Sequence, residues 1–384
     1  MQVDMPVAIE TTDSVNSAIL AVSEDRLQGF RVDPLAEVAR QSLVPLATVH
    51  ERIIAMLEAG TIRRVRQTLM SVNLARGALV AWRVPAEKLN AAFDFMWEQD
   101  PFSGHIVIRS TDKETPGSQY RLWTTLKVPD GFSMARHCEE LQKRTGAEAF
   151  KLMSAKRVFA LGVGHVRRKS IEPGSKSETL AEPHDTEFVQ LSDLDWQVLV
   201  PLKAEFTADE LRRAAQRPAE QFWLDRAKDA GVSLDEFVRV AQSLYARGVI
   251  GRFSTFLEHV KTNAAGEQVT KYNALFHWAV PAGREIEAGR EVGRFHCMTH
   301  CYWREGGPEF NNVNIMGVSH GTDKDRVLAH KAAIDAHLAQ IGIPVSYTNV
   351  FWGGRSEIKP SEISPQAYGA WCVANGIDVS TMRA

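Results

Sequence analysis

An internal repeat constrains this 384-residue sequence more than any other feature. Three short segments recur in the same order in both halves of the chain, and only the connecting lengths differ. The matched segments are 57–65 with 244–253, 80–85 with 276–281, and 105–109 with 300–304. One shared tripeptide would be noise, but three ordered matches predict a tandem duplication.

The boundary between the two copies is predicted from composition. Residues 169–187 read KSIEPGSKSETLAEPHDTE, which is rich in Ser, Glu, Pro and Gly and poor in apolar residues, as is typical of a solvated linker. The predicted domains are residues 1–70 and 71–170 in the first copy, a linker at 171–190, and residues 191–256 and 257–384 in the second copy. The last domain includes a C-terminal extension.

Each copy is predicted to begin with short helices that lead into a strand. Apolar residues at helical spacing predict helices over 14–24, 34–40 and 45–59, with a strand at 61–66 after Gly60. The corresponding helices of the second copy are predicted at 193–205, 218–230 and 234–247, with Ser233 as the N-cap of the last. Three short helices before a strand that follows a glycine are typical of a winged helix-turn-helix.

The remainder of each copy alternates strands and helices. In the first copy the predicted strands are 78–84, 103–108 and 121–128, with helices at 86–98 and 131–145. In the second copy they are 272–280, 297–303, 314–320 and 345–351, with helices at 286–293 and 324–341. The β-α-β-β-α-β order is that of a ferredoxin-like domain. The predicted fold class is α+β, a tandem duplication of a winged helix-turn-helix plus a ferredoxin-like domain.

Bulk properties exclude several classes of function. The formal charge is −2, with 45 basic and 47 acidic residues, so the composition does not point to a polyanionic partner. The sequence has no apolar run of the ~18 residues that a membrane span needs, and we expect no signal peptide. The four cysteines are too scattered for a secreted disulfide framework, so we expect a reducing cytoplasm and treat Cys297 and Cys301 as passive small residues.

Four motifs of the second copy carry a family resemblance. They are GVIGRF at 248–253, NALFHW at 273–278, THCYWR at 299–304 and NIMGVSHG at 314–321. The first copy is similar at Arg63-Arg64, 105–109, 120–123 and 150–168, although Val107 stands where the second copy has Tyr302, and Lys127 aligns with His320. These motifs resemble those of the siroheme decarboxylases, which are Lrp/AsnC-like proteins, and of the related proteins of d1-haem biosynthesis.

The resemblance implies an enzyme that decarboxylates acetate side chains of siroheme or a closely related iron tetrapyrrole without oxidation. Such a reaction needs cations that grip carboxylates and a group that delivers a proton; arginine suits the first task and histidine the second. Alternate residues of a strand share a face, so His300, Tyr302 and Arg304 are expected to project together, as are His105 and Arg109.

The resemblance also implies residue roles. His300 is expected to be a proton donor or a carboxylate partner, Tyr302 an orienting group, Arg252 and Arg304 anion clamps, and His320 a catalytic residue or an iron ligand. The remaining expected substrate contacts are His105, Arg109, Arg64, Tyr120 and Arg121. No cofactor and no resident metal are expected beyond the substrate itself. The basic residues 165–169 could be a solvated strand end or could grip a propionate.

Two other functions stay open at the level of sequence. A DNA-binding regulator would need a basic reading helix, but helix 45–59 has Arg52 against Glu51 and Glu58, and helix 234–247 is equally mixed. A non-catalytic haem-binding or haem-sensing protein would use the same pocket and leave its ligand unchanged. Expected partners are a tetrapyrrole and either sister decarboxylase subunits or a second copy of the chain; DNA and membranes are not expected.

Overall fold

The computed structural model describes residues 7–70, 73–162, 171–183, 189–258, 262, 266 and 270–384. The described residues form two compact units, and each unit takes segments from both halves of the sequence. The first unit lies within residues 1–71 and 189–271, and the second within residues 72–161, 171–188 and 272–384. The repeat therefore does not separate the chain into one compact body per copy.

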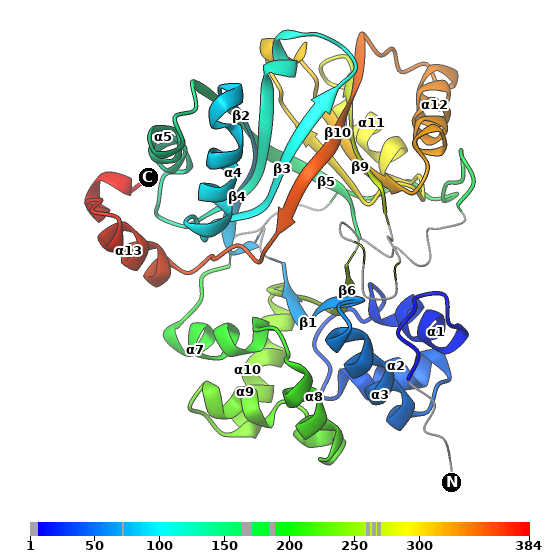
Figure 1. The fold of residues 1–384 in the computed structure, drawn as a ribbon, viewed down its shortest axis with the longest axis vertical. Coiled ribbons are helices and arrows are strands. Elements are labelled where there is room, and N and C mark those ends of the chain that lie inside the picture. Colours follow the sequence, from blue (N-terminus) through cyan, green and yellow to red (C-terminus); the bar gives the residue numbers. More distant parts are fainter. Residues whose placement is uncertain are drawn as a thin grey trace. The chain divides into compact units, whose positions relative to one another are not determined.

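The first unit consists of helices and one pair of strands (Figure 1). Its elements are α1 Ser14–Ser23, α2 Pro34–Ser42, α3 Leu46–Glu58, β1 Ile62–Leu69, α7 Asp193–Lys203, α8 Ala208–Ala215, the 3-10 turn η4 Ala219–Gln221, α9 Leu224–Asp229, α10 Leu234–Ala246 and β6 Ile250–Leu257. β1 and β6 are antiparallel partners. The strand that ends each set of helices thus pairs with its counterpart from the other half of the sequence.

Helix starts in this unit follow from local capping. Asp13 and Asp33 accept hydrogen bonds from the first backbone N–H groups of α1 and α2, which would otherwise lack partners. One prediction was wrong: in place of a single helix over 218–230, the structure has the turn η4 and the short helix α9, and it has a further helix, α8, that was not predicted. Thr207 and Glu210 form a capping box that starts α8, a signal present in the sequence as Thr-x-x-Glu.

In the second unit, eight strands of the described chain close into a barrel. They are β2 Ala75–Arg83, β3 Ser103–Thr111, β4 Tyr120–Pro129, β5 Ala149–Leu161, β7 Tyr272–Ala279, β8 His300–Arg304, β9 Ile315–Gly321 and β10 Tyr347–Ile358. The order around the barrel is β10-β3-β4-β2-β5-β8-β9-β7. Each half contributes a sheet with the ferredoxin-like order, β5-β2-β4-β3 and β10-β7-β9-β8, in agreement with the predicted element order.

Two antiparallel seams join these sheets. β5 pairs with β8 at one seam and β10 pairs with β3 at the other, so the last strand of each half is bonded to the second strand of the other half. Closure removes the unpaired edges that each four-stranded sheet would expose alone. The interior of the barrel is therefore lined by both halves of the sequence.

Helices cover the outside of the barrel (Figure 1). They are α4 Leu89–Glu98 with the turn η2 Ala86–Lys88, α5 Met134–Thr145, α11 Glu285–Gly293, α12 Lys324–Gln340 and, at the C-terminus, α13 Pro365–Ala374 with the turn η6 Val379–Met382. Two further turns, η3 Pro116–Gln119 and η5 Pro308–Phe310, connect strands. Separate apolar cores form under each helical layer, around Trp82 and Phe93 in the first half and Trp278 and Ile334 in the second.

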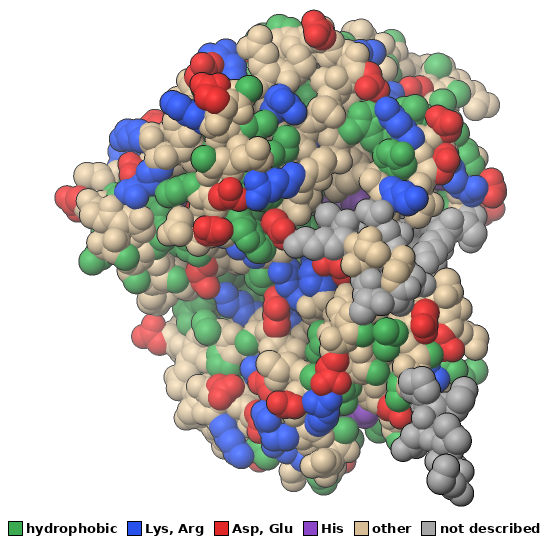
Figure 2. Space-filling view, viewed as in Figure 1, with side chains coloured by type: hydrophobic (Ala, Val, Ile, Leu, Met, Phe, Trp, Pro, Cys, Tyr) green, Lys and Arg blue, Asp and Glu red, His purple; other side chains and the backbone are tan. Residues whose placement is uncertain are grey.

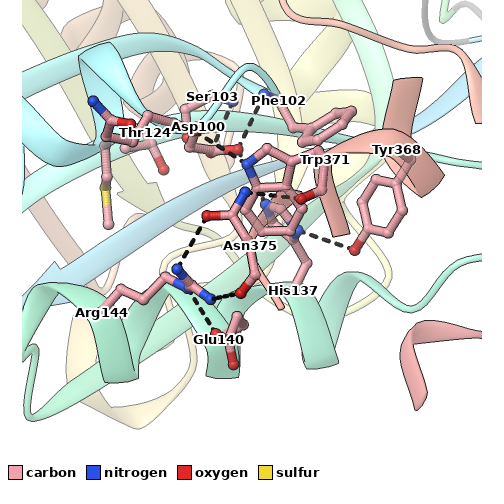
Figure 3. A network of polar contacts seen from close by, with 12 residues as sticks. Asp100, Phe102, Ser103, Thr124, His137, Glu140, Arg144, Tyr368, Trp371 and Asn375 are labelled. Carbon is pink, nitrogen blue, oxygen red and sulfur yellow. Dashed lines mark hydrogen bonds and ion pairs between the residues drawn. The ribbon is translucent and has the colours of Figure 1, made fainter. Parts of the chain in front are cut away.

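The C-terminal extension packs on the first half through a buried polar network (Figure 3). Tyr368 on α13 lies 3.0 Å from Nδ1 of His137, whose Nε2 lies 3.3 Å from Asp100. The Asp100 carboxylate also accepts hydrogen bonds from the backbone N–H groups of Phe102 and Ser103. The final helix of the second half is in this way attached to the core of the first.

Residues 171–183, which lie in the predicted solvated linker, include no buried residue, and they also make hydrogen bonds to the barrel unit. Backbone hydrogen bonds run from Ser177 to the carbonyl of Arg294 and from His296 to the carbonyl of Ser175, and Nζ of Lys176 lies 2.8 Å from Nδ1 of His337. Polar composition indicates a preference for water, but the backbone groups of this segment find partners at the end of α11. Among the described residues, no helix has the length and apolarity required to cross a lipid bilayer.

Candidate functional site

The interior of the barrel contains an apolar cluster to which both halves contribute. Its central side chains are Val107, Trp123, Leu275, Met316 and Phe351. Strand alternation sends every second residue to this face. On β3, His105 and Arg109 are two residues from Val107 and therefore share its interior face. On β9, His320 is two residues from Val318, which packs against the same cluster, so it shares that face as well.

On β8 the alternation is equally clear. Cys301 and Trp303 pack in the core under the helices of the second half, so His300, Tyr302 and Arg304 lie on the opposite, interior face. The imidazole of His300 stacks on the Tyr302 ring with centroids 6.1 Å apart and an interplanar angle of 18°. The guanidinium carbon of Arg304 lies 4.4 Å from the centroid of the same ring. The three predicted residues therefore form one stack, held together by aromatic and cation–π contacts.

A single hydroxyl group lies within hydrogen-bond distance of two histidines. Oγ1 of Thr299 donates to the carbonyl of Val318 at 3.0 Å, which uses its only proton. The same oxygen lies 3.2 Å from Nδ1 of His300 and 3.4 Å from Nδ1 of His320, so it accepts hydrogen bonds from both. This arrangement favours the tautomer with the proton on Nδ1 in both rings.

The two interior arginines make equivalent contacts across the two seams. Arg304 donates from Nη1 to the carbonyl of Met153 on β5, and Arg109 donates from Nη1 to the carbonyl of Phe351 on β10 at 3.1 Å. Met153 and Phe351 occupy corresponding places on the last strand of each half. Each arginine is therefore positioned by the other half of the sequence.

These arginines are buried cations. Arg109 is 5% exposed and Arg304 is 8% exposed, and within the described chain neither forms an ion pair with a carboxylate. Burial lowers the pKa of Arg109 to about 9 and also lowers the pKa of Arg304. Burial raises the pKa of Tyr302, and the charge of Arg304 opposes that rise. An uncompensated buried charge costs several kcal/mol, so this interior favours an anion.

His105 and Arg109 on β3 correspond, in the first half of the sequence, to His300 and Arg304 on β8. Its Nε2 lies 2.8 Å from Oγ of Ser356 on β10, and Nη2 of Arg109 donates to Oδ1 of Asn273 at 3.2 Å. The structure thus brings His300, Tyr302, Arg304 and His320 together at one seam. It places His105 and Arg109 at the other seam of the same interior.

Other predicted site residues lie elsewhere. Tyr120 is buried against Phe310, with ring centroids 5.3 Å apart, and Arg121 is exposed at the start of β4, so the interior holds Tyr120 as a packing residue and does not include Arg121. Arg64 and Arg252 belong to the first unit, where Arg64 pairs with Glu205 at 2.7 Å and Nε of Arg252 donates to the carbonyl of Glu24. Residues 163–170, which include the predicted basic stretch from His165 to Lys169, lie outside the described residues.

One interior residue was missed by sequence reasoning. His277 on β7 has no exposed surface, and neither of its ring nitrogens has a hydrogen-bond partner among the residues that the structure describes. Its ring lies 4.9 Å from the ring of Phe351 and 6.0 Å from that of Trp123. Burial, followed by the positive charge of Arg109, lowers the pKa of His277 to about 3. The signal in the sequence was a histidine between two large aromatic residues, Phe276 and Trp278. Because neighbouring strand residues face opposite sides, His277 had to face away from the core that contains these two rings.

Comparison with known proteins agrees with this architecture. The AsnC-like ligand binding domain model matches twice, at residues 74–160 and 270–347. A siroheme decarboxylase of Hydrogenobacter thermophilus is 24% identical over 297 residues, covering 77% of this chain and 80% of that protein. The chain is a homologue of the siroheme decarboxylases. A siroheme decarboxylase NirH subunit of Stutzerimonas stutzeri is 26% identical over 119 residues, covering 30% of this chain and 65% of that subunit.

Solved structures show the same fold. The crystal structure of the siroheme decarboxylase NirDL superposes with a TM-score of 0.63 at 18% sequence identity, covering 94% of this chain and 99% of that one. The structure of NirDL in co-complex with an iron-uroporphyrin III analogue gives the same TM-score and identity and covers 94% of this chain and 100% of that one. The likeness extends over both halves of the sequence.

Proposed function

We propose that this siroheme decarboxylase homologue removes carboxyl groups from acetate side chains of siroheme or a closely related iron tetrapyrrole. The observation that carries the proposal is the stack of His300, Tyr302 and Arg304. It faces an interior that contains two buried guanidinium groups, and no carboxylate of the described residues forms an ion pair with either. Carboxylates of a tetrapyrrole are the anions that would compensate both charges.

The proposed reaction requires two tasks, the binding of carboxylates and the delivery of a proton, and different residues perform them. Arg304 and Arg109 bind carboxylates through their planar forks. The bond between the acetate methylene carbon and its carboxylate carbon breaks, CO₂ leaves, and the electron pair passes into the conjugated ring. Protonated His300 then delivers the proton from Nε2 to the methylene carbon, which becomes a methyl group. Tyr302 orients His300, and His320 supplies a second imidazole that could ligate the iron of the substrate.

The domain organisation, the further substrate contacts and the partners are also part of the proposal. We infer a tandem duplication of a winged helix-turn-helix and a ferredoxin-like domain, with domains at 1–70, 71–170, 191–256 and 257–384. The equal strand order of the two sheets and the two matches of the ligand binding domain support it. We retain His105, Arg64 and Arg252 as proposed substrate contacts, and we withdraw Tyr120, which packs against Phe310, and Arg121, which is exposed. Sister decarboxylase subunits or a second copy of the chain remain proposed partners.

The test is turnover of siroheme. Purified protein is incubated anaerobically with siroheme, and the mass of the tetrapyrrole is followed by chromatography. Conversion of His300 to Ala should lower the rate by roughly 10²- to 10⁴-fold, the usual contribution of positioned proton transfer. His296→Ala, which removes an exposed imidazole outside the barrel, is the matched control and should retain full activity. Equal turnover in both variants refutes the role of His300.

The same preparation distinguishes the other two functions. A tetrapyrrole that binds and is recovered with unchanged mass identifies a haem-binding or haem-sensing protein. DNA binding would appear as a salt-dependent gel shift. The structure does not favour it: Arg52 on α3 lies 3.4 Å from Asp13, Arg239 on α10 lies 3.2 Å from Glu236, and Figure 2 shows acidic and basic side chains interspersed on the visible face.

A further inference from the structure

Thr299, the residue directly before β8, has a buried side chain to which the proposed reaction assigns no role. It is 2% exposed. Its backbone N–H donates to the carbonyl oxygen of Val318 on β9 at 2.9 Å, and its Oγ1 donates to the same oxygen at 3.0 Å. Because two hydrogen bonds end on one carbonyl group, both the backbone and the side chain of Thr299 are fixed against β9.

The Thr299 hydroxyl also joins two imidazole rings from neighbouring strands. Its oxygen lies 3.2 Å from Nδ1 of His300 and 3.4 Å from Nδ1 of His320. A hydroxyl oxygen has two acceptor lone pairs besides its one proton, so it can accept a hydrogen bond from both rings. The hydrogen bond at one nitrogen of an imidazole influences which nitrogen carries the proton. This hydroxyl therefore restrains both rings and favours Nδ1 as the protonated nitrogen in each.

The first half of the sequence has no hydroxyl at the corresponding place. His105 corresponds to His300, so Gly104 stands where the second half has Thr299. A Cβ atom at Gly104 would overlap Oγ of Ser361, so a side chain at this place would require Ser361 to move. The two halves therefore differ at the residue that precedes the interior histidine.

The first half also holds its histidine through the opposite ring nitrogen. Nε2 of His105 lies 2.8 Å from Oγ of Ser356 on β10, whereas His300 is held through Nδ1. Lys127 stands at the place of His320, because each lies two positions beyond the register partner of the histidine of its half. The pair of imidazoles joined by one hydroxyl therefore belongs to the second half.

We propose that Thr299 is a positioning residue, whose hydroxyl holds His300 and His320 in a fixed relation and makes β8 and β9 the reacting side of the barrel interior. The inference rests on the proposed function and deepens it, because it assigns proton delivery to one half of the chain. A group that transfers a proton acts efficiently when another group orients it. Thr299 acts through the two imidazoles, so its effect is expected on the chemical step and not on substrate binding.

Three variants test the role of the hydroxyl. Thr299→Val removes the hydroxyl and keeps the shape, so kcat for siroheme should fall about tenfold with little change in KM. Thr299→Ser keeps the hydroxyl and should retain most of the activity. Thr145→Val makes the same exchange on α5, where Oγ1 donates to the carbonyl of Leu141, and should leave kcat unchanged. Equal losses in the Ser and Val variants of Thr299 would identify a packing residue, and an unchanged kcat in Thr299→Val would remove the positioning role; either result overturns the proposal.

The ring tautomers provide a readout that does not depend on turnover. NMR of the ligand-free protein, isotope-labelled at the histidine ring nitrogens, reports which nitrogen carries the proton, and His300→Ala and His320→Ala assign the two rings. Both rings should be protonated at Nδ1 above neutral pH. Thr299→Val should shift the ring signals of both histidines and leave those of His105 in place. Protonation at Nε2 in either ring, or signals that Thr299→Val does not move, overturns the proposal.

The two measurements also separate this inference from the decarboxylation itself. If siroheme keeps its mass but Thr299→Val shifts both sets of ring signals, the hydroxyl bridge stands and the proposed reaction falls. If siroheme is converted and Thr299→Val retains full kcat with unmoved ring signals, the positioning role alone falls.

Discussion

At the scale of single residues, several charged and polar side chains of the barrel unit are buried, although burial disfavours their charged forms. Arg304 and Arg109 keep buried charges that backbone carbonyls only partly satisfy. Asp100 and His137 are buried as well, but they lie close together, with Nε2 of His137 3.3 Å from Oδ1 of Asp100. Buried cations that pair with no acid of the described residues are suited to bind an anionic ligand. The Asp100 carboxylate, which has His137 and two backbone N–H groups around it, is suited to hold the fold together.

Arg304→Lys tests whether geometry as well as charge is needed at β8. Lysine retains the positive charge but loses the planar fork and the stacking over Tyr302, so siroheme turnover should fall at least tenfold. Arg121→Lys makes the same exchange at the exposed start of β4 and should leave turnover intact. Steady-state rates of the two variants provide the comparison. A fully active Arg304→Lys variant would mean that a point charge is sufficient.

The pH dependence of stability follows from Asp100. Burial by itself raises the pKa of Asp100, but the charge and hydrogen bond of His137 and the hydrogen bonds from Ser103 and Phe102 outweigh it, and the net pKa is lowered. A lowered pKa means that the folded state binds the proton more weakly than the unfolded state. The stabilising contribution is therefore present above the unfolded pKa of about 3.9 and is lost as pH falls through the folded value.

Melting temperatures measured from pH 7 to pH 3 check this contribution. The unaltered protein should be more stable than Asp100→Asn at neutral pH, and the difference should shrink as the solution becomes acidic. A difference that is constant over this range would show that the charge of Asp100 does not contribute.

At the scale of elements, the packing of α11 against β5 secures one seam. Gly289 on α11 lies against the ring of Phe159, a buried side chain of β5 that is 4% exposed. A Cβ atom at Gly289 would lie 2.1 Å from that ring, a distance that real contacts do not reach. Glycine inside a helix costs about 0.5–1 kcal/mol relative to alanine, so its presence here is explained by close approach.

Two Gly→Ala substitutions should therefore have opposite signs. Gly369 lies within α13, and a Cβ there would meet nothing within 4 Å. Gly369→Ala should raise the free energy of unfolding by about 0.5–1 kcal/mol, whereas Gly289→Ala should lower it by about 1–3 kcal/mol through overpacking. Denaturant unfolding measures both. Adding Phe159→Leu to Gly289→Ala should recover part of the loss, and a lack of recovery would place the strain elsewhere.

At the scale of the whole molecule, the two halves complete each other. Each half alone would end in unpaired edges at its second and last strands, because β3, β5, β8 and β10 find partners across the seams. The arginine of each half would also lose the carbonyl that positions it. The two halves therefore provide, in one chain, the kind of mutual contacts that two subunits make in a closed dimer.

Separating the halves tests this dependence. When the chain is divided between residues 183 and 189 and both fragments are expressed together, they should purify as a one-to-one complex. Either fragment alone should aggregate or self-associate through its free strand edges. Size-exclusion chromatography distinguishes these states, and two stable monomers would contradict the expectation.

Several features were determined by the sequence alone, because they depend on local periodicity and chemistry. The repeat, the helices and strands of both ferredoxin-like segments, and the common face of His300, Tyr302 and Arg304 follow from spacings of 3.6 and 2 residues. The motif resemblance added the reaction class, and similarity to known proteins supports it. Local patterns failed at α8, where a Thr-x-x-Glu cap was overlooked. The polar composition of residues 171–183 predicted a solvated linker but did not indicate which groups its backbone would bond.

Only the tertiary structure decided which strands meet at the seams. Arg109 is held by Phe351 and Asn273, more than a hundred residues away, and no local pattern encodes that distance. The burial of His277 has the same origin, because a strand residue becomes interior only when a sheet closes on itself. Sequence periodicity assigned each side chain to a face of its strand, and barrel closure decided which of those faces lost contact with water.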